Sequence, residues 1–152
     1  MLVALKTSLL NGCQYCIGHN TIAGEALGCD AQQIDALAVD YTGSGLFSDA
    51  EVAAIDWAHH LTERTHRGRP ELAANLKRHY TEAEIVELTM MCGYWNFWNR
   101  FTDGLQLEFE GQAFNENFGR KLNSVNVDDY VDYMNACWWN GASDTSEDLR
   151  SA

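Results

Sequence analysis

Helix-start signals recur along the chain, and they limit its fold more than any other feature of the sequence. Three pairs of residues have the spacing of a capping box, in which two side chains bond to the free backbone N–H groups at the start of a helix. The pairs are Asp30 with Gln33, Ser48 with Glu51, and Thr81 with Glu84. The single proline, Pro70, suits the first position of a further helix. Alternation of β-branched residues is nearly absent, so the pattern predicts an all-α protein.

The predicted helices are separated by short polar or glycine-containing segments. They are expected near residues 2–11, 13–27, 31–39, 49–66, 70–79, 82–101, 103–118 and 127–139. The main internal loop is expected at 40–47, and a polar basic turn at 64–69. We expect one helical domain over residues 1–140, followed by a polar acidic tail at 141–152.

The segment from Ile85 to Phe101 carries apolar or aromatic side chains on most of its faces. A helix of this kind is either central in a core or buried by a partner. In a chain of 152 residues both are possible, so we predict a homo-oligomer.

Charge and hydropathy exclude several classes of function. The chain has 10 basic and 22 acidic residues, for a formal net charge of −12. This charge disfavours nucleic acids and anionic membranes as partners. No run approaches the length of a membrane span, and the first residues lack the basic start and cleavage site of a signal peptide. The expected location is cytoplasmic.

The pattern Cys13-Gln14-Tyr15-Cys16 is the strongest candidate for chemistry. Asn11-Gly12 before it is a turn signal, so Cys13 is expected at or near a helix N-cap. Free N–H groups and the helix dipole favour a thiolate there, and the thiolate is the nucleophilic form of cysteine. Cysteines three positions apart lie close enough for a disulfide after local adjustment.

Two polar residues follow on the same helix. His19 lies about 60° from Cys16 around the helix axis, and it is a candidate proton acceptor. Asn20 lies on the dithiol face and could orient a sulfur, a water or a substrate. Two other interpretations stay open: the cysteines could be buried apolar residues, or Cys13, Cys16 and His19 could bind zinc with His59 or His60.

The stretch from Asn11 to Thr21, NGCQYCIGHNT, resembles the signature of AhpD-like alkylhydroperoxidases in the carboxymuconolactone decarboxylase family. Segments 47–51 and 76–88, together with 96–100, resemble later parts of the same family. The resemblance covers roughly residues 2–110.

The resemblance implies an all-helical fold that assembles as trimers or hexamers. It also implies a thiol-dependent peroxidase or disulfide reductase with no bound cofactor or metal. In such proteins the second cysteine attacks a peroxide and becomes a sulfenic acid, and the first resolves it to a disulfide. Carried over, Cys16 is peroxidatic and Cys13 resolving, while a protein or lipoyl-type dithiol is the external reductant.

Three positions depart from the family pattern. The relay glutamate, twelve residues before the first cysteine, falls on Met1. The histidine between the cysteines is replaced by Tyr15, which with Asn20 is then expected to orient the substrate. The relay's second histidine falls on Asn20, and His19 takes the position that some relatives use. Two explanations stay open for the missing glutamate: the sequence is truncated at its start, or the relay acid comes from elsewhere in the chain.

Two alternative functions remain. One is a decarboxylase or lactone-type enzyme of the same family, which would work by acid–base groups without the cysteine pair. The other is a non-catalytic subunit or binding protein, which the aromatic segment 95–101 and Trp138-Trp139 would suit as docking surfaces.

Overall fold

The computed structural model describes residues 1–110, which form helices joined by loops and turns, with no strand in that range. The helices are α1 (Leu2–Asn11), α2 (Gln14–Ala26), α3 (Ala31–Val39), α4 (Asp49–Thr62), α5 (Pro70–His79) and α6 (Glu82–Gly104). The all-α prediction is confirmed for this part of the chain. The predicted helix at 127–139 and the predicted tail at 141–152 lie outside the described residues.

The helix starts follow from local chemistry. All three predicted capping boxes are present, with Asp30, Ser48 and Thr81 as the N-cap residues of α3, α4 and α6. Pro70 occupies the first turn of α5, where its missing N–H leaves no bond unmade. Gly12 ends α1 in the left-handed conformation, at φ 68°, so the chain turns directly into α2.

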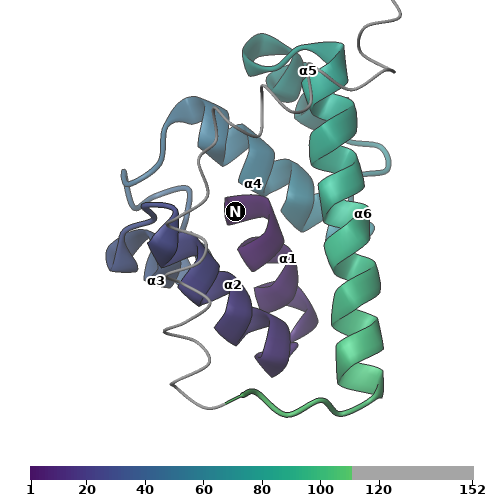
Figure 1. The fold of residues 1–152 in the computed structure, drawn as a ribbon. Coiled ribbons are helices and arrows are strands. Elements are labelled where there is room, and N and C mark those ends of the chain that lie inside the picture. The colour runs from purple at the N-terminus through teal and green to yellow at the C-terminus, as the bar shows by residue number, and fades with distance from the viewer. Residues whose placement is uncertain (111–152) are drawn as a thin grey trace, which may run out of the picture.

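Helix α1 lies in the middle of the described fold (Figure 1), where it packs against α2, α3, α4 and α6. Six consecutive residues, Val3–Ser8, are buried, so α1 is enclosed on most of its faces. One side of α1 packs with Ala54, Ala58 and Cys92, and the other packs with Leu37 and Ile55. The short first helix therefore joins the two halves of the apolar core.

The segment Ile85–Phe101 was expected either in the centre of a core or against a partner, and within the described residues it does not lie in the centre. Helix α6 flanks α1 and α4, and buries Cys92, Asn99 and Thr102 on its inner side. Its outer side exposes large apolar side chains, namely Val86, Met90, Met91, Tyr94, Phe97 and Phe101. Apolar residues on all faces of a helix therefore did not tell whether that helix is central or has an uncovered face. The central helix of the described fold is α1.

Two predicted helix boundaries are also wrong. Helix α6 continues through Gly104, and residues 105–110 form a turn and an extended segment where a helix at 103–118 was expected. The break comes at Gln106, whose φ is 53°, and the Leu107 N–H returns to the Thr102 carbonyl. Helix α4 ends at Thr62 rather than residue 66, because Arg64 adopts a left-handed φ of 62°.

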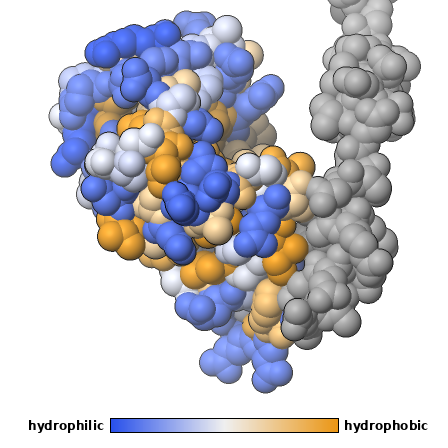
Figure 2. Space-filling model, turned by 90° about the vertical axis from the view of Figure 1, so that its left-hand side faces the viewer, coloured by the Kyte–Doolittle hydropathy of each residue, from blue (hydrophilic) through white to orange (hydrophobic). Residues whose placement is uncertain are grey.

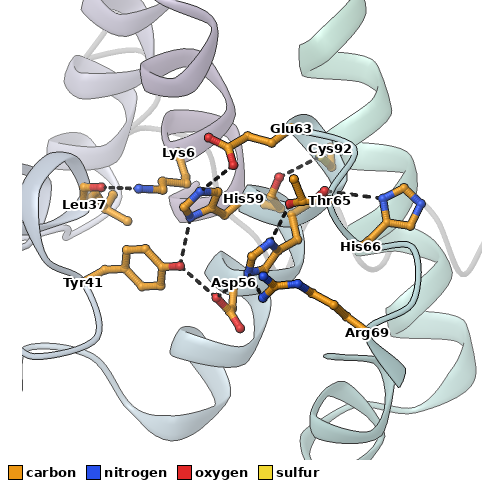
Figure 3. A network of polar contacts seen from close by, with 12 residues as sticks. Lys6, Leu37, Tyr41, Asp56, His59, Glu63, Thr65, His66, Arg69 and Cys92 are labelled. Atoms are coloured by element: carbon orange, nitrogen blue, oxygen red, sulfur yellow. Dashed lines mark hydrogen bonds and ion pairs between the residues drawn. The ribbon is translucent and has the colours of Figure 1, made fainter. Parts of the chain in front are cut away.

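A polar network connects α1, α4 and the turn after α4 (Figure 3). The ammonium group of Lys6, 5% exposed, donates to the Leu37 carbonyl at the end of α3 and lies 4.6 Å from the Tyr41 ring centre. The Tyr41 hydroxyl donates to Asp56 at 2.8 Å and lies 3.1 Å from Nδ1 of His59. The buried lysine is thus part of the scaffold that joins α1 to α3 and α4.

The face of the molecule that carries α3 is mostly hydrophilic, with small scattered apolar areas (Figure 2). This surface agrees with the net charge of −12. Within residues 1–110, no helix combines the length and hydropathy that crossing a bilayer requires.

Candidate active site

The two cysteines of the motif lie at the start of α2, as predicted. Cys13 is the N-cap residue, and its sulfur accepts the Cys16 N–H at 3.3 Å. Both side chains are almost fully buried, at 1% and 2% exposure, and both are free thiols. The first helical turn of α2 therefore holds a reduced dithiol with one sulfur on the free N–H groups of the helix.

A hydroxyl group from α6 lies between the two sulfurs. Thr102 Oγ1 is 3.1 Å from Cys13 Sγ and 3.1 Å from Cys16 Sγ. The same oxygen is 2.9 Å from the Trp98 carbonyl, one turn earlier in α6. It also lies 3.4 Å from the Asn99 carbonyl, and since the hydroxyl has one hydrogen, it can donate to only one of these neighbours at a time.

Burial dominates the electrostatics of Cys16. It raises the pKa of the Cys16 thiol, and the hydrogen bond to Cys13 raises it further. Hydrogen bonds from Thr102 and Asn99 act in the opposite direction. At Cys16, burial therefore acts against the thiolate that a helix N-terminus favours. A neutral Cys16 thiol needs a proton acceptor before it can attack.

The two cysteines line different cavities. Cys16 lines a cavity of about 240 Å³ together with Tyr15, His19, Tyr94, Trp95, Trp98, Thr102 and Leu107. Cys13 lines a second cavity of about 290 Å³ with Gln14, Tyr15, Thr102, Asp103, Gln106 and Leu107. The Cys16 cavity is mostly aromatic, and the Cys13 cavity includes carboxylate and amide groups. One sulfur is thus approachable from an apolar side and the other from a polar side.

His19 lies beside Cys16 in the aromatic cavity and is paired with an acid that the sequence alone did not indicate. Its Nε2 atom is 2.7 Å from Oε2 of Glu110, and the Tyr15 hydroxyl donates to Oε1 of the same carboxylate at 3.0 Å. The rings of Tyr15 and His19 are 4.5 Å apart. The pKa of Glu110 is lowered, first by its own backbone N–H and then by His19 and Tyr15.

A glycine on α2 allows the segment after α6 to reach this site. In Figure 1 the segment leaves the end of α6 and runs back beneath α2. The ring of Phe109 rests on Gly18, where any Cβ atom would overlap it, and it meets the His19 ring edge-on at 5.1 Å. Glu110 follows directly, which places its carboxylate on His19.

Asn20, expected to orient a substrate, contacts α1 in the structure and lines neither of the two cysteine cavities. It is buried on α2, and its amide nitrogen donates to Ser8 Oγ at 3.0 Å. The Asn99 amide donates to the same oxygen at 3.1 Å and contributes a hydrogen bond to Cys16. Within the described residues, the amide that bonds to the Cys16 sulfur is thus that of Asn99 on α6, while the Asn20 amide joins α2 to α1.

His59 lies in the separate network of Figure 3, and His60 follows it on α4. His59 contacts Tyr41 and Glu63, and His60 contacts Thr65 and Asp56. None of these contacts of His59 and His60 involves Cys13 or Cys16. Within residues 1–110, no group of His, Cys, Asp and Glu side chains is arranged to hold a metal ion. The zinc interpretation therefore finds no support in the described residues.

Three residues of the site were missed by sequence reasoning, namely Asn99, Thr102 and Glu110. Asn99 lies in the apolar stretch Ile85–Phe101, and Thr102 directly follows that stretch on α6. These polar residues, about one turn apart, were an available signal for an inner polar face. Glu110 lies in a region predicted as helix, and no local pattern connects it to His19.

An all-α protein with a buried dithiol at a helix start is the class that this fold and site define. The sequence model of the carboxymuconolactone decarboxylase family matches residues 1–60. The match covers the segment that carries the dithiol, and it confirms the resemblance found in the sequence.

Two relatives extend the similarity beyond that segment. The uncharacterised protein YdfG of Bacillus subtilis (strain 168) is 29% identical over 102 residues, which are 66% of this chain and 69% of YdfG. A crystal structure of a protein of unknown function from Agrobacterium tumefaciens, described as a candidate antioxidant defence protein AhpD, is 27% identical. It superimposes with a TM-score of 0.68, covering 73% of this chain and 76% of that one.

Proposed function

We propose that this protein is a thiol-dependent peroxidase or disulfide reductase, in which Cys16 and Cys13 cycle through sulfenic acid and disulfide. The observation that carries the proposal is the convergence of both sulfurs on the Thr102 hydroxyl while each lines its own cavity. The match of residues 1–60 to the family model and the similarity to the AhpD-like structure support the same chemistry.

In the first step, His19 takes the proton of the Cys16 thiol. The thiolate then attacks one peroxide oxygen, so that an S–O bond forms and the O–O bond breaks. The departing alkoxide or hydroxide takes a proton from the imidazolium, and Cys16 becomes a sulfenic acid. The aromatic lining of the Cys16 cavity suits an organic hydroperoxide.

In the second step, the Cys13 thiolate attacks the sulfur of Cys16. The S–S bond forms, the S–O bond breaks, and the hydroxide leaves as water after taking a proton. An external dithiol, on a protein or a lipoyl-type carrier, then attacks Cys13 from the more polar cavity. The carrier becomes the disulfide and the pair returns to two thiols.

The exposed apolar side of α6 supports assembly as a homo-oligomer, which we propose to be a trimer or hexamer in the cytoplasm. Tyr94 belongs both to this exposed side and to the Cys16 cavity. A partner packed on α6 would therefore cover one side of that cavity. Sedimentation of the purified full chain measures the assembly directly.

The test of the function is turnover of an organic hydroperoxide with a dithiol reductant by the parent, Cys16→Ser and Cys13→Ser. The parent should turn over, Cys16→Ser should lose turnover, and Cys13→Ser should accumulate a trappable sulfenic acid on Cys16. Turnover by Cys16→Ser at the parent rate would contradict the proposal. Activity on a cyclic carboxylate that survives alkylation of both cysteines would favour the decarboxylase alternative.

A further inference from the structure

The carboxylate of Glu110 bridges two residues of the dithiol helix. One oxygen lies 2.7 Å from His19 Nε2, and the other accepts the Tyr15 hydroxyl at 3.0 Å. His19 also lines the same cavity as Cys16, so one histidine contacts the carboxylate and borders the cavity of the proposed attacking sulfur. Glu110 comes from the segment after α6, 91 positions from His19 in the sequence.

The position of Glu110 is fixed by the packing of the residue before it, Phe109, against α2. Phe109 occupies the space above Gly18 and meets the His19 ring edge-on. The side chain of His19 is 14% exposed and that of Glu110 is 38% exposed, so the pair is only partly open to water. Two hydrogen bonds to one carboxylate also fix its orientation on α2.

A carboxylate on one imidazole nitrogen determines which nitrogen carries the proton in the neutral ring. With Oε2 of Glu110 on Nε2, the hydrogen of neutral His19 belongs on Nε2 and the other nitrogen, Nδ1, is the basic one. The carboxylate keeps its own charge and stabilises the imidazolium while the ring holds a proton. The position of the family's relay acid is occupied here by Met1.

We propose that Glu110 is the acid of this site: a positioning residue that holds His19 in the tautomer and orientation that accept the proton of Cys16. The inference rests on the proposed function in that it assigns the proton acceptor to His19. Glu110 acts through the imidazole and does not touch the reacting sulfur.

The decisive variant is Glu110→Gln in the full-length protein, which keeps the shape of the side chain and removes its charge. Glu110→Asp restores the charge, and Glu108→Gln is the matched control, since Glu108 is exposed and has no hydrogen bond or ion pair among residues 1–110. Two readouts are used: the rate at which iodoacetamide alkylates Cys16, located by mass spectrometry, and the ¹⁵N chemical shifts of the His19 ring.

Glu110→Gln should slow alkylation of Cys16 by about tenfold or more, as removing the carboxylate partner of a functional histidine commonly does. It should also shift the His19 ring away from the Nε2–H form, because the amide N–H₂ can donate to Nε2. Glu110→Asp should recover part of the rate, and Glu108→Gln should leave both readouts unchanged. Combining His19→Asn with Glu110→Gln should slow the reaction no further than His19→Asn alone.

Alkylation of Cys16 in Glu110→Gln within twofold of the parent rate would overturn the inference, as would an unchanged His19 tautomer. Additive effects of His19→Asn and Glu110→Gln would also overturn it, since Glu110 would then act by another route. Both readouts are independent of peroxide turnover. A parent that fails to reduce peroxide therefore contradicts the proposed function, while the alkylation and ¹⁵N results decide the role of Glu110 separately.

Discussion

The hydroxyl oxygen of Thr102 lies 3.1 Å from the sulfur of Cys16, although the residues are 86 positions apart in the chain. The same oxygen contacts Cys13 Sγ and the Trp98 carbonyl. While both sulfurs are thiols, the hydroxyl can donate to the carbonyl and accept from the S–H groups. When Cys16 loses its proton, the hydroxyl can turn its hydrogen to the thiolate, so Thr102 adapts to both states.

Replacing this hydroxyl should make the Cys16 thiolate harder to form. Thr102→Val keeps the branched shape and removes the donor, so the pKa of Cys16, already raised by burial, should rise by about one further unit. Thiolate absorbance in the ultraviolet, followed against pH, measures this change. Thr102→Ser keeps the hydroxyl and should titrate like the parent; equal titration of the valine and serine variants would refute the role.

Gly18→Ala should lower the reactivity of Cys16 without unfolding the helix that carries it. Alanine favours a helix over glycine by about 1 kcal/mol, but the new Cβ would overlap the Phe109 ring and displace the segment that carries Glu110. We therefore expect slower alkylation of Cys16, by about the factor expected for Glu110→Gln, with little loss of helix content by circular dichroism.

The matched control is Gly93→Ala on α6, where an added Cβ meets no atom within 4 Å. This variant should gain thermal stability and react like the parent. If Gly18→Ala reacts as fast as Gly93→Ala, the contact between Phe109 and Gly18 does not position the acid.

Ser8→Ala removes a single oxygen atom, and we expect it to destabilise the fold strongly. The Ser8 oxygen accepts the amide hydrogens of Asn20 and Asn99 at 3.0 and 3.1 Å, and all three residues are buried. Removing it leaves two buried donors without that acceptor, so the free energy of unfolding should fall by about 2–4 kcal/mol. Urea unfolding with an unchanged m-value measures the loss. Ser44→Ala, in the loop before α4, should cost less than about 1 kcal/mol, and equal losses would contradict this account.

Glu84 should stabilise α6 in a pH-dependent way. The backbone N–H and then the hydroxyl of Thr81 bond its carboxylate and lower its pKa below the ordinary 4.5. A depressed folded-state pKa adds stability above the unfolded-state value, and that stability is lost as the pH falls through the folded-state value. The parent should therefore unfold at higher urea than Glu84→Gln at neutral pH, and the gap should close below pH 4.5. A gap that is constant from neutral to acidic pH would show that the charge contributes nothing.

The start of each helix and the place of the dithiol were predictable from the sequence, for a physical reason. A capping box joins residues three positions apart, so Ser48 with Glu51 and Thr81 with Glu84 can be identified without any tertiary contact. The turn at Gly12 likewise places Cys13 at an N-cap whatever surrounds it.

The surroundings of the dithiol were decided only by the tertiary structure. Thr102 and Glu110 lie 86 and 91 positions from the residues they contact, and they reach them because α6 packs on α1 and α2 and the chain then reverses at Gln106. The pKa of Cys16 is raised by burial, which local sequence cannot reveal, so the place of the dithiol at a helix N-terminus does not by itself give the direction of that shift. Short-range hydrogen bonds thus determined where the sulfurs lie, and long-range packing determined which groups surround them.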